Sequence, residues 1–115
     1  MRTKVIEIPT SGIVDWDTFH DVFDATLGFP QFYGRNMNAW IDCLSNADDA
    51  SSGLVANPVS SGDLLTLSII DAAEFKQRCP DQFETLIECA AFVNYRRRVV
   101  GDGPILALLI DGNFS

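Results

Sequence analysis

Apolar residues along this chain change between strand-like runs and helix-like spacings, and these changes mark seven elements. Short apolar runs predict strands at Thr3–Ile8, Leu64–Ile70 and Ile105–Ile110. The run at Leu64–Ile70 is rich in Leu and Ile, as expected of a central strand covered on both faces. Because helices join the strands, right-handed crossovers would make the sheet parallel. We therefore predict an α/β fold with a small three-stranded parallel sheet and the order β-α-α-β-α-α-β.

The first two predicted helices each have one apolar face. Asp15 is a suitable N-cap for a helix that runs to about Leu27, and Gly28 ends it. The apolar stripe of this helix consists of Trp16, Phe19, Phe23 and Leu27. The second helix spans Asn36–Ser45. Its core face holds Met37, Trp40 and Leu44 with Ile41 at the edge, and its solvent or partner face holds Asn38, Asp42 and Ser45.

Two further helices lie between the second and third strands. Asp71 is expected to cap a short helix at Ala72–Cys79, and Pro80 to begin a longer one that ends near Arg97. The inner side of the longer helix is predicted to hold Phe83, Leu86, Ile87, Ala90, Ala91 and Asn94. The segment Asn46–Gly62 is rich in Ser, Ala, Asn and Gly and is predicted to be a loop. A loop of this length in so small a domain is either functional or mobile.

The composition fits one domain across residues 1–115. Of these residues 47% are apolar and 10% aromatic, which is enough for one core. The net charge is −8, and the segment from Val5 to Phe75 carries −10 of charge, with eleven acids against one base, Arg35. A nucleic-acid binder needs a basic face for phosphates, so we expect no direct nucleic-acid binding, and a cationic partner is the natural complement. The cluster Arg96–Arg98 suits a helix C-terminus, and its alternative role is contact with RNA or an acidic partner.

Signals for export and for catalysis are lacking. No signal peptide or membrane-spanning run is visible, so we expect a cytoplasmic protein with no membrane contact. Cys43, Cys79 and Cys89 lack metal-ligand spacing and are expected to be reduced, buried thiols. The one histidine, His20, has no visible acid–base partner, so packing is favoured over catalysis. We therefore predict no catalytic residue, metal or cofactor, and a small enzyme is the least favoured hypothesis.

One segment carries a specific pattern. Residues 29–45 read Phe-Pro-Gln-Phe-Tyr-Gly-Arg-Asn-Met-Asn-Ala-Trp-Ile-Asp-Cys-Leu-Ser. This segment resembles the signature of the barstar family, which are intracellular inhibitors of barnase-type ribonucleases. Its Pro, aromatic pair, Gly, Asn, Ala and Asp-Cys-Leu stand at the family's spacing. The resemblance implies a barstar-like three-layer fold, with which the predicted order of elements agrees.

In that family, the loop before the second helix and the outer face of that helix plug the ribonuclease active site. The resemblance implies that Asp42 replaces the acid that sits where a substrate phosphate would. Asn38 stands where a second acid is usual, Phe32 replaces a contact-making Tyr, and Ile41 stands where an exposed Trp is common. The family's acid late in the last helix aligns near Arg97. The expected partner-binding residues are Phe32, Gly34, Asn36, Asn38, Ile41, Asp42 and Ser45.

The function implied by this resemblance is that of an immunity or antitoxin protein, which would bind a cationic ribonuclease toxin 1:1 and block it. Since several contact positions differ from the family's pattern, a ribonuclease other than barnase is favoured as the partner. The alternative is a barstar-fold interaction protein or regulatory adaptor with no nuclease partner. Tyr33 and Gly34 have a structural alternative as well, in which they make the turn that aims the second helix, with Gly34 at positive φ.

Overall fold

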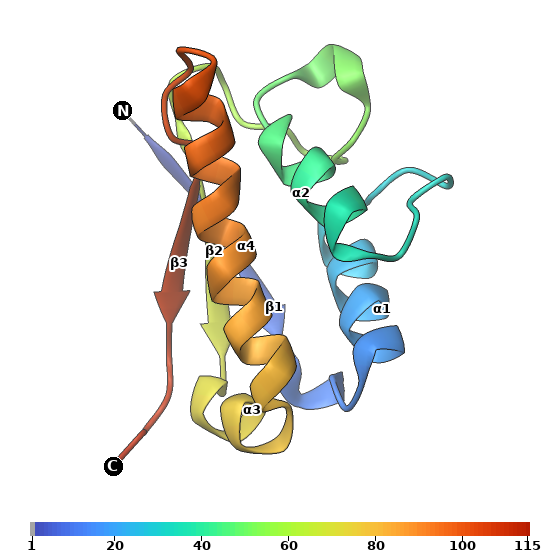
Figure 1. Cartoon of the computed structure of the whole chain (residues 1–115), viewed down its shortest axis with the longest axis vertical. Helices are drawn as coiled ribbons and strands as arrows, with labels where there is room; N and C mark the ends of the chain where they lie inside the picture. Colours follow the sequence, from blue (N-terminus) through green and yellow to red (C-terminus); the bar gives the residue numbers. More distant parts are fainter. Residues whose placement is uncertain (1) are drawn as a thin grey trace.

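The computed structural model describes residues 2–115 and contains a parallel sheet and four α-helices (Figure 1). The strands are β1 (Thr3–Pro9), β2 (Leu64–Ile70) and β3 (Leu106–Ile110), with β2 in the centre. The helices are α1 (Trp16–Leu27), α2 (Met37–Ser45), α3 (Ala72–Arg78) and α4 (Pro80–Val99). The predicted α/β class, parallel sheet and order of elements are confirmed.

The sheet buries one face under helices and leaves the other open. Ile6 of β1 lies beside Leu67 of β2, which lies beside Leu108 of β3, and all three side chains belong to the core. α1 packs on β1 and α4 packs on β3. On the opposite face, Val5 and Leu109 are 55% and 53% exposed. No residue of β2 is itself exposed, and Ser68 on this second face is only 5% exposed, so the prediction that β2 is covered on both faces holds although its neighbours Val5 and Leu109 are open to solvent.

Local signals set the ends of α1 where the sequence predicts them. Asp15 accepts the backbone N–H of Thr18 at 2.9 Å, and the Thr18 hydroxyl accepts the N–H of Asp15 at 3.0 Å, which forms a capping box. Gly28 ends the helix with φ 65°, and a Cβ at that position would lie 2.4 Å from the Cβ of Ala56. Asp71 differs from its prediction. Its φ is 53°, and its side chain makes no capping hydrogen bond within residues 2–115.

α4 begins at Pro80 as predicted, but its buried side is rotated from the predicted one. Ile87, at 41% exposure, and Ala91 both face solvent. Asn94 lies on the inner side as predicted, where its side chain makes hydrogen bonds to the backbone at the start of β3. The buried residues of α4 are Leu86, Ala90 and Val93. The side of the helix that holds Ile87 and Ala91, which the sequence pattern assigns to the core, therefore faces solvent.

The segment of residues 46–62 is a loop, as predicted, and it is packed against the helices. It contains one 3₁₀ turn, Ala50–Ser52. The N–H of Ala56 donates to the carbonyl of Leu27 at 3.0 Å. The N–H of Val59 donates to the carbonyl of Ala47 at 2.9 Å. Its buried side chains include Ala47, Val55 and Val59. The loop is thereby tied to the C-terminal ends of α1 and α2.

Candidate protein-binding site

α2 presents two polar side chains on its outer face. The side-chain oxygen of Asn36 accepts a backbone N–H of the first turn at 2.8 Å and so caps the helix. Asn38 and Asp42 follow one turn apart and are both exposed, with 61% of the Asp42 side chain accessible. On the other side of the helix, Trp40 is fully buried. Burial of that side fixes the amide of Asn38 and the carboxylate of Asp42 toward solvent.

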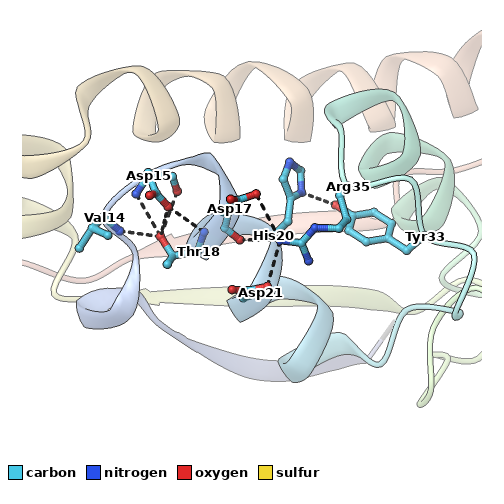
Figure 2. Close-up of polar contacts among 8 residues, drawn as sticks. All are labelled: Val14, Asp15, Asp17, Thr18, His20, Asp21, Tyr33 and Arg35. Carbon is cyan, nitrogen blue, oxygen red and sulfur yellow. Dashed lines mark hydrogen bonds and ion pairs between the residues drawn. The ribbon is translucent and has the colours of Figure 1, made fainter.

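The loop before α2 is attached to α1 through two of its residues, Tyr33 and Arg35 (Figure 2). The Tyr33 hydroxyl lies 2.6 Å from Nδ1 of His20. Arg35 places Nη2 at 2.9 Å from Oδ1 of Asp21, and the same nitrogen donates to the backbone carbonyl of Asp17 at 2.9 Å. In the view of Figure 1, α2 lies between α4 and this loop. Loop and helix are thus held by α1 in one arrangement before any partner binds.

The Tyr33–His20 pair is buried and uncharged. His20 is 4% exposed and Tyr33 is 8% exposed. Burial lowers the pKa of His20 below its usual 6.5, and the nearby charge of Arg35 lowers it further. Burial likewise raises the pKa of Tyr33, so its hydroxyl keeps its proton at neutral pH. These contacts support the packing role expected for His20 and the structural role considered for Tyr33.

The tip of the loop is open to solvent. Phe32 is 78% exposed, which is unusual for a large apolar side chain. Gly34 and Asn36 are exposed too, although the Asn36 side chain is engaged in the helix cap and donates to the carbonyl of Gly34 at 3.3 Å. The positive φ in this turn, 54°, belongs to Arg35, so assigning it to Gly34 was wrong by one residue.

Two expected partner-binding residues, Ile41 and Ser45, are buried. Ile41 is 7% exposed and belongs to the core beside Trp40. Ser45 is 9% exposed, although helix spacing places it on the side of Asn38 and Asp42. Its carbonyl accepts a hydrogen bond from Arg97 at 2.9 Å, because α4 covers this end of α2. Ile41 and Ser45 therefore offer little surface to a partner, and their contact with one stays a prediction.

Asp42 has a cation of the same chain beside it. Arg96 of α4 donates from Nη1 to Oδ1 of Asp42 at 2.8 Å. The side chains are 44% and 61% exposed, so this is a surface ion pair, a kind that contributes about 0.2–1 kcal/mol. Sequence reasoning missed the pair, because 54 positions separate the two residues and no local spacing links them.

Arg97 points inward and has a structural role. Its guanidinium binds both carboxylate oxygens of Asp48, at 3.0 and 2.9 Å, and the two side chains are 12% and 15% exposed. Its Nε donates to the carbonyl of Gly103 at 2.7 Å. Arg98 lies over the ring of Tyr95, with 5.6 Å from the guanidinium carbon to the ring centre. The position that aligns near the last-helix acid of the family thus holds a largely buried arginine paired with Asp48.

A polar hollow of about 570 Å³ lies beside Arg97, between the end of α2, the loop of residues 46–62 and the turn before β3. Neither His20 nor a cysteine lines it or the other hollows described for residues 2–115. Burial also raises the pKa of the Cys43 thiol to about 11, which makes it a poor nucleophile. Across those same residues, no cluster of three or more His, Cys, Asp or Glu side chains could hold a metal ion.

None of the helices in residues 2–115 has both the length and the apolar character needed to cross a membrane.

The family model described as Barstar (barnase inhibitor) matches residues 3–102. The matched range begins with β1, contains the whole of the site and ends just beyond α4, so it leaves out β3. No match was found among curated proteins.

Proposed function

This chain belongs to the barstar family, and we propose that it inhibits a cationic ribonuclease toxin by occupying the active site of that enzyme. The inhibitor binds 1:1 in the cytoplasm of a bacterial cell, where it acts as an immunity protein or antitoxin and catalyses no reaction. The family's description as a barnase inhibitor supports inhibition over catalysis. The alternative of an adaptor without a nuclease partner is not favoured, since the matched family is one of inhibitors.

The observation that supports this proposal most is an exposed acid on a fixed helix within the matched range. A ribonuclease must hold the phosphates of RNA, so its active site is cationic. Asp42 offers a carboxylate for that site, and Asn38 offers an amide one turn away. Because contacts with α1 and the core already order α2 and its preceding loop, binding loses little conformational entropy.

Phe32 adds an apolar contact at the edge of this surface. Its side chain is 78% exposed, so a partner that covers it gains hydrophobic burial. The net charge of −8 acts at longer range, where it attracts a cationic enzyme and speeds encounter. Salt should therefore weaken binding by slowing association.

Co-expression with the ribonuclease encoded by a neighbouring gene tests the proposal, with intact cellular RNA and cell growth as the readouts. We expect the wild-type chain to prevent RNA degradation. Asp42→Ala should weaken binding of the purified ribonuclease about ten- to hundred-fold, the effect of losing a hydrogen bond to a charged group. Glu84→Ala is the matched control, because it removes one exposed acid from the end of α4 nearer α3. Equal effects of the two substitutions would contradict the assignment of Asp42, and failure to bind any ribonuclease would contradict the function.

A further inference from the structure

Arg96 differs from the other arginines of α4 because it contacts the proposed binding face. It reaches Asp42 through one nitrogen and one oxygen, Nη1 and Oδ1, at 2.8 Å. Arg97, in contrast, is held by four hydrogen bonds to Asp48 and two carbonyls, and Arg98 lies over Tyr95. Among residues 2–115, the Arg96 side chain makes a single hydrogen bond and is 44% exposed, so it can exchange its partner while the fold is unchanged.

We propose that Arg96 occupies the carboxylate of Asp42 in the free protein and that a partner's cation must displace it. In this way Arg96 determines which partners bind. This inference rests on the proposed function. A partner lysine would replace the one hydrogen bond from Arg96 with one hydrogen bond of its own, so binding would gain little free energy. A guanidinium that binds both oxygens of Asp42 forms two parallel hydrogen bonds, and such paired contacts are the stronger and more specific kind. The site therefore selects an arginine presented end-on to Asp42.

The displaced Arg96 imposes a second condition on the partner. Its side chain stays at the edge of the interface, because it is anchored on α4 next to α2. Facing a uniformly cationic surface, its charge would oppose docking, and like-charge contacts of this kind are a common source of specificity. We therefore expect the partner to place an acidic side chain beside the arginine that binds Asp42. The pair Asp42–Arg96 thus recognises a complementary pair and rejects a cleft with positive charge alone.

Substitution of Arg96 gives the test. The probes are purified cationic bacterial ribonucleases, barnase included, and the measurement is the dissociation constant at fixed salt. Arg96→Gln should bind a ribonuclease that lacks the acidic group about two- to five-fold tighter than Arg98→Gln does, as expected when an exposed ion pair no longer competes. Arg98→Gln is the matched control, since it removes the same charge from the same helix without a contact to Asp42.

A double-mutant cycle isolates the contact. In an Asp42→Asn background, the gain of Arg96→Gln over Arg98→Gln should be smaller than in wild type, because position 42 no longer carries a charge for which cations compete. Thermal melting of each variant checks that the fold is kept. If wild type binds a ribonuclease that lacks the acidic group and Arg96→Gln binds it no tighter than Arg98→Gln does, this inference is overturned and the proposed function stands. If neither wild type nor Arg96→Gln binds any of the ribonucleases, both are overturned.

Discussion

Replacing Arg97 with alanine is predicted to destabilise the fold severely, although the residue sits in a run of three arginines at a helix end. Its guanidinium makes four hydrogen bonds of 2.7 to 3.0 Å, two to the Asp48 carboxylate and one each to the carbonyls of Ser45 and Gly103. These bonds join α4 to the end of α2 and to the turn before β3. Alanine would leave a largely buried carboxylate without its counter-ion.

The burial of the pair sets the magnitude. Asp48 is only 15% exposed and Arg97 12%, against 61% and 44% for Asp42 and Arg96. Breaking a buried ion pair by removing one partner costs about 3–5 kcal/mol, whereas an exposed pair contributes about 0.2–1 kcal/mol. We therefore expect Arg97→Ala to lower the free energy of unfolding by about 3–5 kcal/mol, and Arg96→Ala by at most about 1 kcal/mol.

Urea unfolding followed by the fluorescence of buried Trp40 measures this difference. At an m-value of about 1.5 kcal/mol/M, the midpoint should fall by about 2–3 M for Arg97→Ala. The double variant Arg97→Met with Asp48→Leu should recover most of the loss, because no charge is then left buried alone. A loss below about 1 kcal/mol for Arg97→Ala, or a double variant no more stable than the single one, would refute the reasoning.

Two further predictions concern the buried pair that attaches the loop to α1. Tyr33→Phe should lower the free energy of unfolding by about 1–3 kcal/mol, since Nδ1 of His20 loses its buried partner, while exposed Tyr95→Phe should have little effect in the same urea assay. Because folded His20 has its pKa below the unfolded value near 6.5, the unfolded chain binds more protons at mildly acidic pH, so stability should fall as pH drops below about 6.5. His20→Asn should reduce that slope, and an unchanged slope would contradict the assignment of His20 as a buried neutral group.

Most of the fold could be predicted from local pattern because local interactions determine it. The capping residue Asp15 and the stop at Gly28 set α1 to within a residue, and the predicted helix Asn36–Ser45 differs from α2 only in its first residue. The face of α4 could not be chosen this way. Apolar residues occur all around that helix, so Ile87 and Ala91 fit a core-facing stripe as well as the residues that the sheet covers.

In the site, too, local spacing predicts some features, and contacts between distant segments set the others. Helix spacing alone places Asn38 and Asp42 on one exposed side, and the structure agrees. Spacing fails for Ser45, because burial there depends on Arg97, which comes from 52 positions further along the chain. The same holds for Arg96, because the spacing of residues along the chain does not predict its contact with Asp42. Contacts between distant segments decide which members of a helix face remain available to a partner.

Folding also brings arginines next to the acids of the segment from Val5 to Phe75. Within residues 2–115, arginines form four ion pairs with acids of this segment: Arg35 with Asp17 and Asp21, Arg96 with Asp42, and Arg97 with Asp48. Pairing does not change the net charge of −8, so attraction of a cationic enzyme across distances of about 10 Å is kept and is sensitive to salt. At contact distance attraction is weaker, because the exposed carboxylate of Asp42 already has the guanidinium of Arg96 beside it. General acidity can therefore recruit many cationic proteins, while the exchange of Arg96 for a better-placed arginine selects among them. Salt acts mainly on the first step and substitution of Arg96 on the second, which makes the two separable by experiment.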